Sequence, residues 1–284
     1  MPTTQLRVGL WVLGLVSLFY LTAVFPLAYF RHDDWLILGN AVHHFALDWT
    51  SAFHPTLFYV NEEIVWFFRP VFKALVYVFY RLLGFNYYLW LAVLYACFVA
   101  SVALGCAAVS KLTRSTYWGL FSFVLLLASL HAHFGSLFWM GEGMMNCPQL
   151  FLLAANLFLF SLAREKYFYL NQALAYLCFV LALGIKESSV FHAGFLGLIV
   201  LLDSGFEKKR KLGLLVLYGL SGAVYLYFRL VVVPVNPYYV PKTHFWPFAK
   251  ALLTLLGALA LPLLILVSCS GEDLQPIGKR IKKR

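Results

Sequence analysis

Two neighbouring carboxylates, Asp33 and Asp34, follow the first apolar stretch of the chain and precede Trp35. A carboxylate that is partly desolvated beside an aromatic ring and lies near a base can act as a general base or bind a metal ion. An acid at the end of an apolar helix can equally be a helix cap or a solvated group. The pair is therefore a candidate catalytic site with a purely structural alternative.

Three other charged residues, Arg69, Lys186 and Glu187, are candidates for holding an anion. The guanidinium fork of Arg69 suits phosphate oxygens, although an Arg that precedes a first-turn Pro can also simply reach for a polar interface. Lys186 and Glu187 are adjacent between two apolar stretches, where charge is costly. We expect them to form an ion pair that faces the interior of a helix bundle or a watery cavity.

Glu142 and Asn40 are further candidate substrate-binding residues. Glu142 lies between two glycines in the stretch 138–146, and these glycines predict a turn that lets the backbone approach a ligand closely. No strand precedes this Gly-x-Gly, so it is not a nucleotide-binding loop. Asn40 follows soon after the acidic pair.

The elements that must position these residues are membrane helices, because 62% hydrophobic and 12% charged residues cannot cover a water-soluble globule. Apolar runs of about 20 residues match a hydrocarbon layer of roughly 30 Å, and helices satisfy their own backbone groups in lipid. The sequence predicts an all-α integral membrane protein, one polytopic domain of residues 1–284. We expect about eight transmembrane helices, at 8–30, 87–110, 116–134, 148–163, 167–185, 188–203, 212–233 and 249–269.

Two connections in this series stand out. The fifth and sixth spans are separated only by a short segment at Lys186 to Ser189, so a bent or re-entrant arrangement stays open there. The first loop, 31–86, is far longer than a turn between helices requires. Its last part, 71–83, has apolar residues at helical spacing and ends at Gly84, which predicts an amphipathic helix on the membrane surface.

Charge placement predicts the orientation, because cytoplasmic loops retain Lys and Arg. With both termini in the cytoplasm, the long first loop is extracytoplasmic and the cytoplasmic segments, including the basic tail 270–284, hold 14 bases against five acids. The bases then anchor the chain and attract anionic membrane lipids, so the positive charge does not indicate nucleic-acid binding. We expect a multi-pass protein of a bacterial plasma membrane or the endoplasmic reticulum.

The sequence identifies no cofactor. The five cysteines show neither metal-ligand spacing nor a disulfide pattern. The acidic pair has no clear additional ligands, so it is only a weak indication of a metal site, and a divalent cation stays open.

The order of these features resembles the GT-C superfamily of polytopic glycosyltransferases, especially protein O-mannosyltransferase-like enzymes. The likeness covers about residues 10–205, and its motifs are short. They are the outward acidic pair Asp33-Asp34, Asn40, Phe68-Arg69-Pro70, the helix end Leu83-Gly84-Phe85-Asn86 and the later Lys186-Glu187.

This resemblance implies a sugar donor carried on a polyprenyl phosphate and an active site on the extracytoplasmic side. Asp33 or Asp34, with Asp33 favoured, would be the general base that deprotonates an acceptor hydroxyl. Arg69 and Lys186 would neutralise the phosphate leaving group. Glu187 would orient Lys186 or a donor hydroxyl, and the acceptor itself stays unknown.

A non-enzymatic lipid-binding protein, transporter or assembly subunit is the alternative. Transporters show polar groups deep in several spans and often inverted repeats, whereas most charges here lie at span ends and no repeat is evident. This pattern favours an interfacial active site. The chain has fewer spans than these enzymes commonly have, so it fits a short, truncated or inactive member, with a partner subunit as one explanation.

Overall fold

The computed structural model describes residues 30, 32–40, 56–60, 63–66, 68–119, 121–122, 139–164, 167–202 and 206–232, with a few single positions between 11 and 22. All of them belong to one compact unit, Met1–Asn236. The second unit, Pro237–Arg284, lies outside the described residues, and so do the predicted basic tail and the eighth span. The first and third predicted spans lie largely outside them as well.

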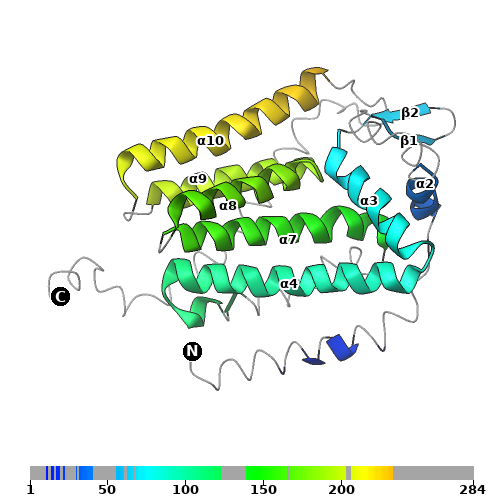
Figure 1. Ribbon diagram of the computed structural model, residues 1–284, viewed down its shortest axis with the longest axis horizontal. Coiled ribbons are helices and arrows are strands. Elements are labelled where there is room, and N and C mark those ends of the chain that lie inside the picture. The colour runs from blue at the N-terminus through cyan, green and yellow to red at the C-terminus, as the bar shows by residue number, and fades with distance from the viewer. Residues whose placement is uncertain are drawn as a thin grey trace, which may run out of the picture. The chain divides into compact units, whose positions relative to one another are not determined.

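Five helices run side by side and form the body of the described unit (Figure 1). Consecutive helices α7 to α10 alternate in direction, and α7 packs on both α4 and α8. Their bounds are α4 Tyr87–Thr113, α7 Met140–Ala163, α8 Phe168–Leu183, α9 Val190–Leu202 and α10 Lys208–Tyr227. Helices are therefore present at five of the eight predicted positions.

Two of these helices, α4 and α7, are long and apolar enough to cross a membrane. Their 27 and 24 residues give lengths of about 40 Å and about 36 Å at roughly 1.5 Å per residue, more than a hydrocarbon layer needs. Shorter apolar helices cover Phe168–Leu183 and Glu187–Leu202. These two helices support the prediction that the chain contains apolar helices of membrane-spanning length.

Polar side chains join four helices inside this body. The amide of Asn156 on α7 donates to the carbonyl oxygen of Ala175 at 2.7 Å and to the hydroxyl of Tyr218 at 3.1 Å. Its oxygen lies 2.9 Å from Nε2 of His192 on α9. Asn156 is fully buried, so these bonds satisfy a group that would otherwise be unpaired among apolar side chains, and they fix α7 to α8, α9 and α10.

The start of α7 corrects one prediction. The predicted turn is wrong for 140–146, because α7 already begins at Met140 and includes both glycines and Glu142. A Cβ atom at Gly141 would lie 2.8 Å from Ile37 Cδ1 and 2.9 Å from an oxygen of Asp34. Gly141 therefore allows α7 to pack closely against α2. It does not interrupt α7.

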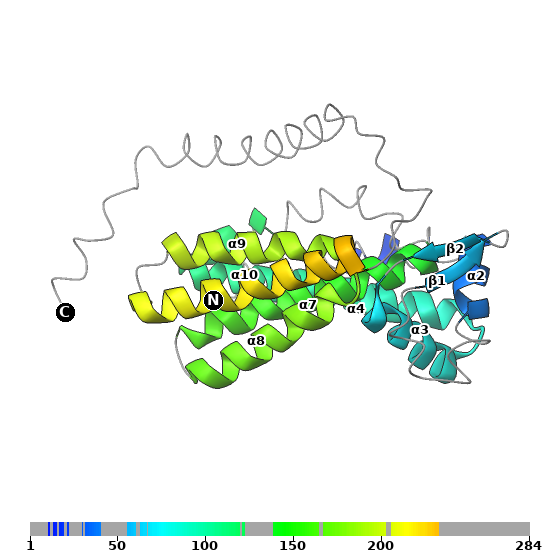
Figure 2. The same cartoon turned by 90° about the horizontal axis from the view of Figure 1, so that it is seen from above.

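The described part of the long first loop lies at one end of the helix body (Figure 2). It contains α2, His32–Asn40, and an antiparallel hairpin of β1, Thr56–Val60, and β2, Glu63–Trp66, in which Val60 is opposite Glu63. Helix α2 contacts α3, α7 and β1. The described chain is thus almost entirely helical, as an all-α class predicts, and this short hairpin is an addition that the sequence analysis did not predict.

The predicted amphipathic helix is present as α3, Pro70–Leu83. Pro70 occupies the first turn, where no backbone N–H is needed, and Gly84 ends the helix with a positive φ of 56°. Phe72, Lys73 and Val76 form its buried face. The helix itself is confirmed, whereas its place on a membrane surface stays a prediction.

The beginning of α3 is attached to the end of α8. The carbonyl oxygen of Gly184 accepts backbone hydrogen bonds from Val71 at 3.0 Å and from Phe72 at 3.3 Å. A Cβ atom at Gly184 would lie 2.5 Å from Val71 Cγ2, which leaves no room for a side chain. This close contact brings Arg69 next to the segment that follows α8.

Replacing Gly184 with Ala should therefore destabilise the protein by about 1–3 kcal/mol, the usual effect of overpacking a tight contact. The double variant Gly184→Ala/Val71→Ala removes the clashing methyl group and should recover part of the loss. Thermal unfolding in detergent measures both effects. The packing would be contradicted if Gly184→Ala were as stable as the original protein. It would also be contradicted if the loss of stability in the double variant were larger than the summed losses of the two single variants.

Candidate functional site

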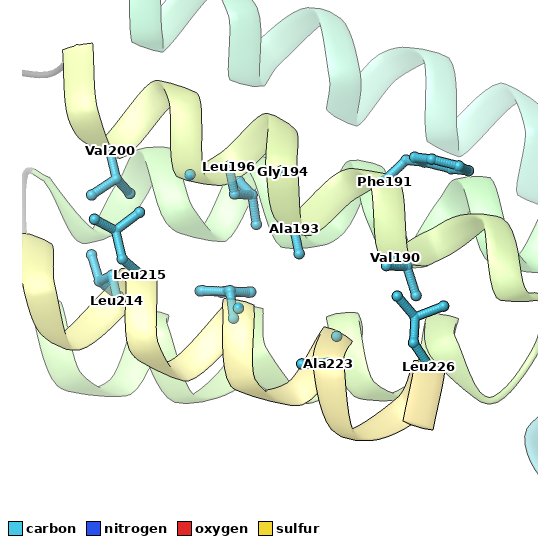
Figure 3. A pocket seen from close by; sticks show the side chains of 14 residues that line it. Val190, Phe191, Ala193, Gly194, Leu196, Val200, Leu214, Leu215, Ala223 and Leu226 are labelled. Carbon is cyan, nitrogen blue, oxygen red and sulfur yellow. The ribbon is translucent and has the colours of Figure 1, made fainter. Parts of the chain in front are cut away.

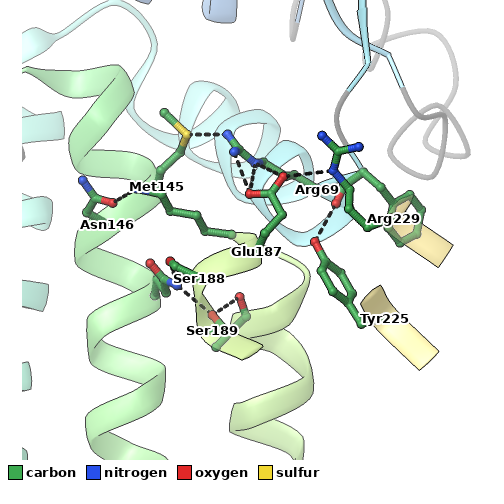
Figure 4. A network of polar contacts seen from close by, with 12 residues as sticks. Arg69, Met145, Asn146, Glu187, Ser188, Ser189, Tyr225 and Arg229 are labelled. Atoms are coloured by element: carbon green, nitrogen blue, oxygen red, sulfur yellow. Dashed lines mark hydrogen bonds and ion pairs between the residues drawn. The ribbon is translucent and has the colours of Figure 1, made fainter. Parts of the chain in front are cut away.

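An ion pair between Arg69 and Glu187 forms the centre of the site (Figure 4). Arg69 Nη2 lies 2.7 Å from Glu187 Oε2, and Nε lies 3.2 Å from the same oxygen. The side chains are 10% and 26% exposed, so the pair is largely desolvated. Two donors on one carboxylate give the fixed geometry that Arg forms more readily than Lys.

Arg229 is the second guanidinium at this carboxylate, and the sequence analysis missed it. It lies in η6, a π-helical turn Phe228–Val232 that follows α10, and its Nε is 3.5 Å from Glu187 Oε1. Arg229 could have been identified from sequence by its position inside the predicted span 212–233. An Arg within an apolar span is costly and is therefore a functional candidate. Glu187 thus balances two positive charges.

Lys186 lies beside this cluster and donates a hydrogen bond from Nζ to Oδ1 of Asn146 at 2.7 Å (Figure 4). Burial lowers the pKa of Lys186, and the charge of Arg69 lowers it further, while Glu142 and Glu187 act in the opposite direction. These mutual effects show that Glu142, on the first turn of α7, belongs to the same electrostatic neighbourhood. Three bases and two carboxylates therefore share one end of the helix body.

The burial of Glu187 by itself raises its pKa, but the charge and hydrogen bonds of Arg69 and the charge of Arg229 outweigh this effect. The net result is a pKa below the ordinary value, so the carboxylate is ionised at neutral pH. Its role in the described geometry is to hold two arginines in place. The predicted ion pair between Lys186 and Glu187 is therefore wrong, because Glu187 pairs with Arg69 and Arg229 while Lys186 donates to Asn146.

The turn that carries Glu187 is fixed by hydroxyl groups. Glu187–Ser189 form a short 3-10 segment, η5, between α8 and α9. The amide nitrogen of Gln149 donates to Ser188 Oγ at 2.9 Å and to Ser189 Oγ at 2.7 Å, and Ser189 Oγ donates to the carbonyl oxygen of Ala182 at 2.8 Å. α8 and α9 are therefore two separate helices with an ordered connection.

The segment before α3 is also fixed. The hydroxyl of Tyr225 donates to the carbonyl oxygen of Phe68 at 3.1 Å (Figure 4), and the Phe68 ring lies 4.6 Å from that of Phe228. Nη1 of Arg69 lies 2.9 Å from the sulfur of Met145, which is a weak acceptor. An anionic oxygen near this donor would form a stronger bond than the thioether does.

Asp34 has a structural role in the described geometry. Its side chain is fully buried, and Oδ1 accepts a hydrogen bond from the backbone N–H of Gly141 at 2.6 Å. Gly141 is the second residue of α7, so Asp34 satisfies a first-turn N–H as an N-cap side chain does. Asp33 and Asn40 lie in α2, but their side chains are outside the described residues.

Lys73 is a further buried base, one turn after Arg69 on α3. Burial lowers the pKa of Lys73 to about 8. The sequence pattern of 71–83 did not indicate that Lys73 is buried. No group of three or more metal-ligating side chains occurs in the part of the chain that the structure describes.

An apolar groove of about 510 Å³ runs between α9 and α10 (Figure 3). Val190 and Leu226 line one end of it, and Leu196 and Leu215 line its length. Val190 directly follows η5, and Leu226 lies three residues before Arg229. Both residues at this end of the groove are therefore within three residues, along the sequence, of a member of the charged cluster.

No family model, curated protein or solved structure matches this chain. The likeness to GT-C enzymes therefore stays a prediction from short motifs. What the structure adds is spatial: it brings Arg69, Lys186, Glu187 and Glu142 together, and it places Asp34 against the residue before Glu142.

The lowered pKa of Glu187 predicts a pH dependence. An acid with a folded-state pKa below its unfolded value adds stability that is present above the unfolded pKa and is lost as the pH falls through the folded pKa. The stability gap between the original protein and Glu187→Gln should therefore narrow below about pH 4.5. Thermal unfolding between about pH 7 and about pH 3 measures this, with the exposed Glu207→Gln as control. A pH-independent gap would contradict the ionised pair.

The contact of Asp34 predicts a graded response to substitution. Asp34→Ala should destabilise the protein by about 1–2 kcal/mol through loss of the bond to Gly141, as in other N-cap deletions. Asp34→Asn keeps an oxygen acceptor and should lose clearly less. Equal losses in the two variants, measured by unfolding in detergent, would mean that the carboxylate charge and not the hydrogen bond matters.

Proposed function

We propose that the chain is a multi-pass membrane glycosyltransferase of GT-C type that moves a sugar from a polyprenyl-phosphate-linked donor to an acceptor hydroxyl. The observation that carries the proposal is the juxtaposition of a base-rich cluster with one end of an apolar groove. A lipid phosphate has the same two parts, a compact anion and a long apolar chain.

The charged cluster supplies the phosphate-binding half. Arg69, Arg229 and Lys186 exceed the two carboxylates Glu187 and Glu142 by one positive charge, three minus two, in surroundings that are mostly buried. A phosphate near Lys186 would offset the burial that lowers its pKa and would favour its charged form. Arginine donors that are already held by Glu187 lose little conformational freedom on binding.

The groove between α9 and α10 supplies the half that binds the lipid chain (Figure 3). Its walls are apolar side chains and glycines, including Gly194, Gly197, Gly219 and Gly222, which keep the helix surfaces shallow. A prenyl chain that lies in this groove would have its phosphate at the end next to Glu187 and Arg229. Binding there requires no opening of the helix body.

The reaction is a substitution at the anomeric carbon of the donor sugar. The acceptor hydroxyl oxygen forms a bond to that carbon, the bond from the carbon to the phosphate oxygen breaks, and the electron pair leaves with the polyprenyl phosphate. The hydroxyl proton passes to a general base, for which we propose Asp33 because Asp34 already accepts the Gly141 N–H. The arginines and Lys186 stabilise the charge that develops on the leaving phosphate.

The proposed topology follows from the same arrangement. The base-rich ends of α4, α7 and α10, which carry Lys111, Arg164 and Lys208, lie at the end of the helix body remote from Arg69 and Glu187 (Figure 1). We propose that this base-rich end faces the cytoplasm and that the charged cluster faces the opposite side. The eight spans and the cytoplasmic termini are part of this proposal.

A lipid-binding protein without catalysis is the second candidate. The engagement of Asp34 by a backbone N–H favours it, because one of the two candidate bases already has a structural task. Both candidates require lipid phosphate binding, and only the first requires a general base. Separate measurements of binding and of transfer therefore distinguish them.

The deciding experiment uses radiolabelled polyprenyl-phosphate sugars and purified protein in membranes. Asp33→Asn should reduce transfer by about 10² to 10⁴ while donor binding is kept. Lys186→Met should weaken donor binding by roughly 10- to 100-fold, as expected for loss of a charged hydrogen bond. The exposed Lys208→Gln has the same charge change far from the cluster and should leave both quantities unchanged.

If the Asp33→Asn protein transfers sugar as fast as the original protein, Asp33 is not the general base. Transfer by Asp34→Asn would then be measured. If donor binding persists without any transfer, the lipid-binding candidate replaces the enzyme. If Lys186→Met and Arg229→Gln both bind the donor as well as the original protein does, the phosphate site itself is wrong.

A further inference from the structure

A second basic cluster surrounds a cavity at the other end of the helix body. Lys111 and Arg114 come from the end of α4, Arg164 from the end of α7 and Arg210 from the first turn of α10. All four line a cavity of about 340 Å³, together with Ser161, Ala163, Phe168 and Phe206. We call these residues the basic pocket.

Contacts with the surrounding structure hold two of the basic side chains of the pocket, Arg210 and Arg164. The Arg210 guanidinium lies 4.9 Å from the centre of the Phe168 ring, a cation–π contact. Arg164 donates to the carbonyl oxygen of Leu112 at 3.4 Å. The Phe206 ring lies 6.1 Å from that of Phe168 and forms the apolar wall. The pocket is therefore built from α4, α7, α8 and α10, with Phe206 from the segment before α10.

Bases at helix ends have an ordinary explanation, because Lys and Arg near the C-termini of α4 and α7 stabilise the helix dipoles. That explanation does not cover Arg210, which lies at the N-terminal end of α10, where a further positive charge is unfavourable. Arg210 Nε lies 3.8 Å from Glu207 Oε2, and this exposed ion pair contributes little stability. No acid is among the described residues that line the pocket.

The position of the pocket indicates what occupies it. Tyr117, Tyr167 and Tyr169 are each more than 60% exposed near the same helix ends, where aromatic side chains typically mark the level of lipid headgroups. Just beyond the pocket, Leu212 of α10 is 65% exposed. The cations thus lie where polar headgroups meet apolar helix surfaces.

We infer that the basic pocket binds the phosphate headgroup of an anionic phospholipid in the leaflet at this end of the molecule. The four cations surround the phosphate, and the acyl chains extend along the exposed apolar surface beside the pocket. This site is separate from the cluster at Arg69 and Glu187, and it does not depend on the catalytic proposal. It does depend on the helices lying in a membrane.

The test compares two double variants with the same change in charge. Arg114→Gln/Arg210→Gln removes two cations of the basic pocket, whereas Lys208→Gln/Lys209→Gln removes two exposed cations of the same region that do not line it. The probe is fluorescent phosphatidylglycerol bound to detergent-purified protein, with phosphatidylcholine as the neutral competitor. The pocket variant should lose about 10-fold or more in affinity, and the control should change less than about twofold.

The outcomes distinguish specific lipid binding in the pocket from non-specific attraction of the lipid to surface charge. Equal losses in both double variants would indicate general surface charge and overturn the inference, and so would no loss in the pocket variant. Displacement of the lipid by inorganic phosphate at equal concentration would assign the pocket to a soluble anion instead. If the pocket variant does not fold, the exposed single variant Arg114→Gln is measured against Lys208→Gln by the same criteria, with a loss of at least about threefold expected.

Discussion

The ion pair between Arg69 and Glu187 determines how the described parts of this molecule fit together. Arg69 precedes α3 and Glu187 follows α8, and they are separated by more than a hundred residues. A largely desolvated pair of this kind is strongly destabilising to break, because one charge would remain buried without its partner. Arg229 joins the same carboxylate, so the first loop, the α8–α9 connection and the end of α10 meet at a single acidic group.

Polar residues on the helices and between them support this arrangement. Gln149, Ser188 and Ser189 fix the backbone around Glu187, and Tyr225 fixes the backbone before Arg69. Each is satisfied by a partner that would be unavailable in lipid. The apolar helices contribute length, packing and donors such as Gln149 and Tyr225, while the segments beside them contribute Arg69, Glu187 and Arg229.

The sequence predicted the parts that follow from local rules. Apolar runs located α4, α8, α9 and most of α10, and Pro70 and Gly84 located the ends of α3 closely. The cost of charge in apolar surroundings identified Lys186 and Glu187. The remainder depends on contacts distant in sequence: the start of α7 needs the contact of Gly141 with α2, and no local pattern pairs Glu187 with Arg229. The burial of Asp34 and Lys73 likewise follows only from how α2, α3 and α7 pack.

The attachment of α3 to Gly184 has a mechanical consequence. The N–H groups of Val71 and Phe72 share the carbonyl oxygen of Gly184. These two hydrogen bonds fix the position of the beginning of α3 but only weakly fix the direction of the helix. The bond between Arg69 and Glu187 provides a second point of attachment. Glu187 therefore helps to set the tilt of α3 together with the packing of its buried face, and a ligand that competes for Arg69 would weaken this second attachment.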